Sequence, residues 1–188
     1  PTAADRDDLI LPREGVDASE PLPLSEIDTR ITRPKISQPR TFSKDILFNL
    51  EKDNTYWNER GITDETLDVF GGGLCKSGRM AHRYIFPIFN KKNKLIGVSG
   101  RDVLKTESKR PKWKHLGDKH NWAYPALISE GFIASEKRAI LVESIGDMLA
   151  LWGAGIKNVL VVFGLNISSS ITSLLLRLDP NEVILSFN

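Results

Sequence analysis

Two acidic residues, Glu143 and Asp147, are the side chains of this sequence best placed to do chemistry. The short apolar run at residues 140–142 predicts a strand that ends at Glu143, and a segment with helical spacing follows from Asp147. Carboxylates at such a strand-to-helix turn can hold a hard divalent cation such as Mg²⁺ or Mn²⁺. Glu143 could also move a proton, and the pair could simply cap the helix, so the residues alone leave these roles open.

The elements that position this turn repeat its pattern along the chain. Residues 159–163 and 183–187 are further apolar runs typical of buried strands, and the serines at residues 168–170 offer caps for a helix between them. The apolar stripe of that helix is Ile171, Leu174, Leu175 and Leu178. Short strand-helix connections favour a parallel sheet covered on both faces. Glu143 and Asn188 then lie at carboxyl ends of strands, where such sheets bind ligands.

A β-hairpin is predicted earlier in the chain, from residues 83–89 and 95–101 on either side of a turn rich in Lys and Asn. Pro87 has no amide hydrogen, so we expect its strand to be an edge strand or to be bulged there. Ahead of the hairpin, Thr63 is expected to cap a short helix that the glycines at residues 71–73 end.

The net charge of +2 conceals a strongly basic middle segment. Residues 75–120 contain 13 Lys or Arg against 3 acidic residues, a local excess of +10, and the rest of the chain carries −8. Such a segment beside an acidic site could bind a polyanion, or it could be an ordinary Lys-rich surface exposed to solvent. Aromatic residues lie among these Lys and Arg residues, as expected of a surface on which unpaired nucleobases stack. The candidate DNA- or nucleotide-binding residues are Arg83, Arg101, Lys112, Trp113 and Lys114.

Three motifs in order resemble the catalytic core of DnaG-type primases. They are YWNERGIT at residues 56–63, the hairpin at residues 83–101 with Asn93 in place of the usual turn glycine, and PKW at residues 111–113. Residues 142–164 then resemble the Toprim domain that these primases share with topoisomerases and some nucleases. The resemblance favours Arg101 and Lys112 most among the binding candidates.

The resemblance also implies the site. Glu143 and Asp147 would be the catalytic residues and, with Asn188, the ligands of Mg²⁺ or Mn²⁺. Asn188 stands where the family has the first Asp of an Asp-x-Asp pair, and because an amide brings no charge it would hold a metal more weakly. The implied activity is synthesis of short RNA primers on a single-stranded DNA template from ribonucleoside triphosphates, a nucleotidyl transfer by a DNA-directed RNA polymerase. A replicative helicase in the primosome is an implied partner.

The fold class expected is α/β, in three parts. Residues 1–40, rich in Pro, form a linker or irregular arm; residues 41–125 form a mixed α+β basic N-terminal subdomain; residues 126–188 form a truncated Toprim subdomain, Rossmann-like with a parallel sheet. We expect the chain to be part of a longer polypeptide. The single cysteine, Cys75, excludes a multi-cysteine zinc site. No apolar run approaches the roughly 20 residues that a membrane span needs. The resemblance to DnaG-type primases implies the cytoplasm of a bacterial or phage-infected cell.

Two other functions use the same residues. A Toprim nuclease or topoisomerase would cleave phosphodiesters with the acids, but the hairpin and PKW motifs resemble primases alone. A non-catalytic protein that binds single-stranded DNA is favoured by the amide at Asn188. An assay with single-stranded template, ribonucleotides and Mg²⁺ or Mn²⁺ distinguishes the three functions. A primase makes RNA primers, a nuclease or topoisomerase nicks the template, and a non-catalytic protein does neither.

Overall fold

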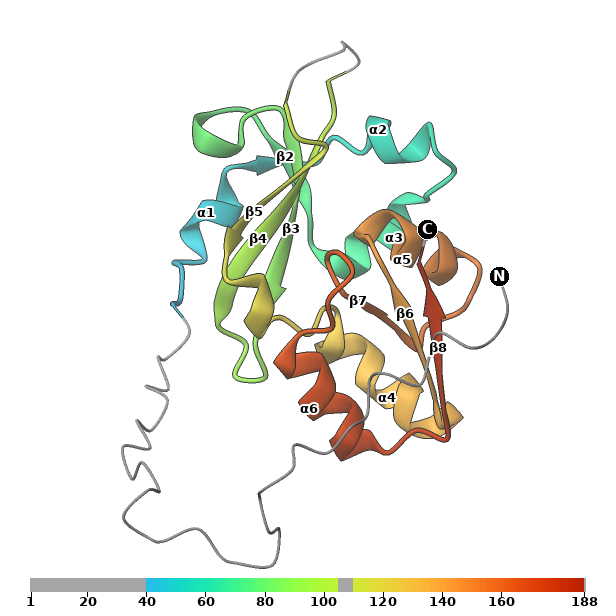
Figure 1. Cartoon of the computed structure of the whole chain (residues 1–188). Coiled ribbons are helices and arrows are strands. Elements are labelled where there is room, and N and C mark those ends of the chain that lie inside the picture. The colour runs from blue at the N-terminus through green and yellow to red at the C-terminus, as the bar shows by residue number, and fades with distance from the viewer. Residues whose placement is uncertain (1–39, 105–109, 188) are drawn as a thin grey trace, which may run out of the picture. The chain divides into compact units, whose positions relative to one another are not determined.

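The structure, a computed structural model, describes residues 40–104 and 110–187, and the chain folds there around two sheets (Figure 1). Most of the arm predicted at residues 1–40 and also Asn188 lie outside the described residues. The first sheet is antiparallel, with strands in the order β1-β2-β3-β4-β5. Its strands are β1 (Leu50–Glu51), β2 (Gly73–Cys75), β3 (Arg83–Phe89), β4 (Leu95–Asp102) and β5 (Trp113–Gly117). The predicted mixed α+β and α/β architecture is confirmed.

The hairpin of β3 and β4 has the predicted limits to within one residue, and it shows how Pro87 is accommodated. Although β3 is an interior strand, its pairing with β2 stops at Ile85, so Pro87 has a partner, Val98, on β4 alone. A register shift follows between Ile88 and Phe89. Pro87 therefore occupies a locally open edge beside a bulge, where its missing amide hydrogen breaks no ladder.

Short helices surround the first sheet. They are α1 (Asp45–Phe48), α2 (Thr55–Asn58) and α3 (Asp64–Phe70), with 3₁₀ turns η2 (Gly78–Met80) and η3 (Lys119–Asn121). The Thr63 hydroxyl accepts a hydrogen bond from the Thr66 amide at 3.3 Å, and Gly71 ends α3 in the left-handed region at φ 61°. Both predicted ends of this helix are confirmed, because each depends only on local capping chemistry.

The second sheet is parallel, in the order β7-β6-β8, with helices between its strands. Its elements are α4 (Ala126–Glu136), β6 (Arg138–Val142), α5 (Ile145–Gly153), β7 (Val159–Val161), α6 (Ser169–Leu178) and β8 (Glu182–Ser186). Ser168 caps α6 as predicted, whereas α5 begins at Ile145, two residues before Asp147. No described helix is both long and apolar enough to span a bilayer.

The expectation that this sheet is covered on both faces is confirmed for β6 and β7 but is wrong for β8. Val183, Ile184 and Leu185 of β8 are exposed, because α4 and α5 pack mainly against β6 and β7. Along β6 and β7, by contrast, the residues are mostly buried.

A single buried cluster joins the two sheets. Trp57, Tyr84 and Phe86 from the first part pack in one core with Met148 of α5 and Phe163, which follows β7. The predicted boundary between residues 125 and 126 falls just before α4, and the core continues across it. The carboxyl ends of β6 and β7 are thereby held against the antiparallel sheet.

Candidate functional site

A cavity of about 180 Å³ lies where the parallel strands meet the antiparallel sheet. The antiparallel sheet contributes three of its side chains, and the segments that follow β6 and β7 contribute the rest. Its lining residues are Ser99, Trp113, His115, Glu143, Ser144, Ile145, Phe163 and Gly164. Strand-end location is typical of ligand sites in parallel sheets, and the opposing sheet supplies the other wall.

Glu143 is the acidic residue of this cavity. It follows the last residue of β6, is half-buried, and has no hydrogen bond or ion pair within the described part of the chain. A carboxylate that is both partly buried and unengaged is a suitable ligand for a hard divalent cation. The structure therefore places Glu143 where the sequence predicts it, and its oxygens fit such a metal.

Asp147 has a structural task in addition to any metal binding. One of its oxygens, Oδ2, accepts hydrogen bonds from the Ser144 amide at 3.1 Å and the Ser144 hydroxyl at 2.8 Å, a capping box at the start of α5. Asp147 does not line the cavity, although it lies in the first turn of the helix that follows Glu143. A carboxylate has further acceptor sites, so capping leaves Oδ1 available to a metal.

Among the described residues, no group of three or more His, Cys, Asp or Glu side chains is close enough to hold a metal ion. The third predicted ligand position, Asn188, lies outside them. The metal site therefore stays a prediction for Glu143 and Asp147, with its third position undescribed.

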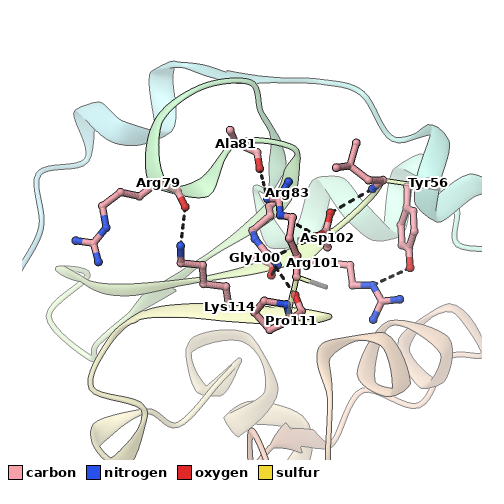
Figure 2. Close-up of polar contacts among 11 residues, drawn as sticks. Tyr56, Arg79, Ala81, Arg83, Gly100, Arg101, Asp102, Pro111 and Lys114 are labelled. Atoms are coloured by element: carbon pink, nitrogen blue, oxygen red, sulfur yellow. Dashed lines mark hydrogen bonds and ion pairs between the residues drawn. The ribbon is translucent and has the colours of Figure 1, made fainter. Parts of the chain in front are cut away.

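Arg83 was predicted to bind phosphate, and its environment corrects this. Its side chain is 1% exposed and lies 3.5 Å from the carboxylate of Asp102, while its terminal nitrogens donate to the carbonyl oxygens of Gly100 at 3.2 Å and Pro111 at 2.9 Å (Figure 2). Burial lowers the pKa of this guanidinium. Arg83 is a buried structural residue that ties β3 to β4 and to the segment before β5, and a phosphate cannot reach it.

Arg101, which precedes Asp102 on β4, is open to a ligand. Its Nε donates to the Tyr56 hydroxyl at 2.7 Å (Figure 2). Its guanidinium lies over the rings of Tyr56 and Trp113, at 5.4 Å and 5.6 Å from their centroids. Two terminal nitrogens have no protein partner in the described chain. Because aromatic faces fix the plane of the guanidinium, these nitrogens are presented for two-point binding of a phosphate.

The other predicted binding residues differ in the contacts that they make with the rest of the protein. Lys112 is exposed and its side chain makes no hydrogen bond or ion pair within the described residues. Lys114 donates to the carbonyl oxygen of Arg79 at 2.9 Å, as Figure 2 shows. Trp113 is half-buried, packs at 6.3 Å from the Trp57 ring and lines the Glu143 cavity. Lys112 and Trp113 are therefore available to a polyanion, whereas Lys114 must first leave its carbonyl partner.

Three residues near the cavity were not among the predicted site residues. Lys119 donates to the carbonyl oxygen of Phe163 at 3.1 Å, and Ser99 and His115 line the cavity wall. Burial and the nearby charge of Lys119 lower the pKa of His115. The only sequence signal was their position in or beside the basic segment, since His115 lacks metal-ligand spacing with the other histidines.

The amino-acid sequence is similar to those of bacterial DNA primases. No family model matches the chain. It is 35% identical to a DNA primase of Borreliella burgdorferi over 137 residues, covering 69% of this chain and 25% of the relative. It is 25% identical to a DNA primase of Helicobacter pylori over 177 residues, covering 76% of this chain and 31% of the relative.

Solved structures show the same fold. The zinc-binding and RNA polymerase domains of the Aquifex aeolicus primase superpose with a TM-score of 0.65 at 22% identity, covering 77% of this chain and 44% of that one. A DnaG primase catalytic domain bound to single-stranded DNA superposes with a TM-score of 0.63 at 20% identity, covering 75% of this chain and 58% of that one. The chain spans 25% to 36% of the length of the curated relatives.

Proposed function

We propose that this chain, which is related to bacterial DNA primases and has the fold of the DnaG-type catalytic core, carries the nucleotidyl-transfer site of a DNA primase. The observation that supports this most directly is the unengaged Glu143 carboxylate at the carboxyl end of β6, in a cavity walled by β4 and β5 of the antiparallel sheet.

The reaction would join a primer 3′-hydroxyl to the α-phosphate of a ribonucleoside triphosphate and expel pyrophosphate. Negative charge develops on the attacking, leaving and phosphoryl oxygens, and Mg²⁺ or Mn²⁺ would neutralise it when bound. Glu143 would hold the metal directly. Asp147 would contribute through Oδ1 while Oδ2 keeps α5 capped, and position 188 would be the third ligand.

The template would lie along the basic surface. Arg101 and Lys112 would bind phosphates of single-stranded DNA, Trp113 would stack on a base at the cavity mouth, and Lys114 would join them after releasing Arg79. In the cell we propose a place in the cytoplasm of a bacterial or phage-infected cell, within a primosome and with a replicative helicase as partner.

The test is primer synthesis on a single-stranded template with ribonucleoside triphosphates and Mg²⁺ or Mn²⁺. The variant Glu143→Gln removes the charge at the cavity and keeps the size of the side chain. Glu136→Gln, at the exposed end of α4, is the matched control and should behave as wild type. Oligoribonucleotides from wild type and from the control, but not from Glu143→Gln, support the proposal.

Two other outcomes would contradict it. Nicked template would indicate a Toprim nuclease or topoisomerase. Binding of single-stranded DNA without synthesis by wild type would favour a non-catalytic role, which is the second candidate because no cluster of three metal-binding side chains occurs among the described residues.

A further inference from the structure

Ser99 and His115 form a pair of directly opposed residues on β4 and β5 that both line the Glu143 cavity. Opposed residues of an antiparallel pair project to the same face, with their Cβ atoms about 5 Å apart. The Ser99 side chain is fully buried, and its hydroxyl has no hydrogen bond to any described residue. The Nδ1 atom of His115 is likewise buried without a partner. Two unpaired polar side chains thus project to the same face from paired positions of neighbouring strands, at the cavity wall.

These two atoms are complementary. A serine hydroxyl can donate, and Nδ1 of a neutral imidazole whose proton is on Nε2 can only accept. An unpaired buried polar group is costly, and a rotation of the Ser99 side chain that brings its hydroxyl to Nδ1 satisfies both groups at once. The ring itself has little freedom to turn, since it packs edge-to-face against Trp122 at 5.8 Å and Phe163 at 5.4 Å.

The other ring nitrogen of His115 is the one open to the cavity. Nε2 is not among the buried unpaired atoms, and it has no hydrogen-bond partner in the described part of the chain. Burial and Lys119 lower the pKa of His115 from its usual 6.5, so the ring is neutral at pH 7 and carries one N–H. With Nδ1 accepting from Ser99, that N–H is on Nε2.

The charges around this N–H select an anionic oxygen. The positive charge of Lys119 acts on His115, and Glu143, which lines the same cavity, would hold the metal of a nucleotide. We propose that His115 donates from Nε2 to a phosphate oxygen of the ribonucleoside triphosphate bound beside Glu143, and that Ser99 is the positioning residue that keeps the proton on Nε2. This inference rests on the proposed function, and it assigns two residues to the site.

The tautomer of His115 tests the Ser99 half of the inference without any activity. Nitrogen-15 NMR of the full chain at pH 7.5 distinguishes an imidazole protonated on Nε2 from one protonated on Nδ1. We expect the Nε2–H tautomer in wild type and a loss of about tenfold in its preference in Ser99→Ala, the factor that one net hydrogen bond represents. The Nδ1–H tautomer in wild type, or an unchanged ring in Ser99→Ala, would overturn the inference.

The His115 half is tested by titration with ATP and Mg²⁺. The Nε2 resonance should shift in wild type, and the affinity for ATP should fall about tenfold in His115→Phe and recover in His115→Asn, which keeps an amide donor. His82→Asn is the control, since His82 is exposed and Asn tolerates its φ of 60°. Shifts at Gly164 or Ser144 without any at His115 overturn this inference alone. A titration in which no resonance moves contradicts the inference and the proposed function together.

Discussion

The sharpest test of the structure compares two arginines at successive positions of the β3-β4 pairing, one buried and one open. Arg83 is opposite Asp102, and Arg101 is opposite Tyr84. Both lie in the basic segment, but within the described part of the chain both terminal nitrogens of Arg83 have protein partners and those of Arg101 have none. We therefore expect Arg83→Met to reduce stability strongly without altering DNA binding, and Arg101→Met to weaken DNA binding with only a small loss of stability.

The magnitudes follow from the contacts. Removing one member of a buried ion pair costs about 3–5 kcal/mol. Asp102 keeps a second partner, Arg110, at 3.2 Å, so we expect the lower end, about 3 kcal/mol, for Arg83→Met. For a domain of this size that is a fall of about 6–12 °C in the midpoint of thermal unfolding. Arg101→Met loses one hydrogen bond to Tyr56, about 1 kcal/mol.

Two measurements on each variant separate these effects. Urea unfolding gives the stability, and the salt dependence of binding to a single-stranded oligonucleotide, well below the unfolding midpoint, gives the number of phosphate contacts. The log-log slope for Arg101→Met should be smaller than that of wild type by about 0.7, whereas Arg83→Met should keep the wild-type slope. An Arg83→Met protein of normal stability but reduced slope would refute the burial argument.

Three further predictions concern the site and its support. Asp147→Asn should abolish stabilisation by Mg²⁺ in a thermal-shift titration, and curves identical to wild type would remove Asp147 from the metal site. The variant should lose only about 0.3–1 kcal/mol of stability, the interaction of the carboxylate with the helix dipole, because the amide oxygen still caps α5. The free energy of unfolding should be highest above pH 6.5 and should decrease as the pH falls from there through the lowered folded pKa of His115, because in that range the unfolded chain binds a proton that the folded chain does not. Urea unfolding between pH 7.5 and 5.5 should show this decrease in wild type and not in His115→Asn. Gly97→Ala should destabilise the domain by about 1–3 kcal/mol, since the added methyl overlaps the buried Trp122 ring, and a normal urea midpoint would contradict this.

The sequence by itself determined the features that depend on local chemistry. Thr63 and Ser168 cap their helices because a hydroxyl reaches the backbone amide three residues on. The alternation of apolar runs predicted three parallel strands, and the position of Glu143 at the end of the first follows from chain order. Pro87 could be assigned to a locally unpaired position because a missing amide hydrogen is a property of the residue.

Only the tertiary structure decided what each polar side chain faces. Arg83 and Arg101 have the same chemistry and lie in the same basic segment, but Asp102 and two carbonyl oxygens enclose the first, and aromatic rings present the second. The pairing of Ser99 with His115 depends on the register of β4 against β5. Burial and register arise from contacts between residues far apart in the chain, so the spacing of residue types within one segment does not contain them.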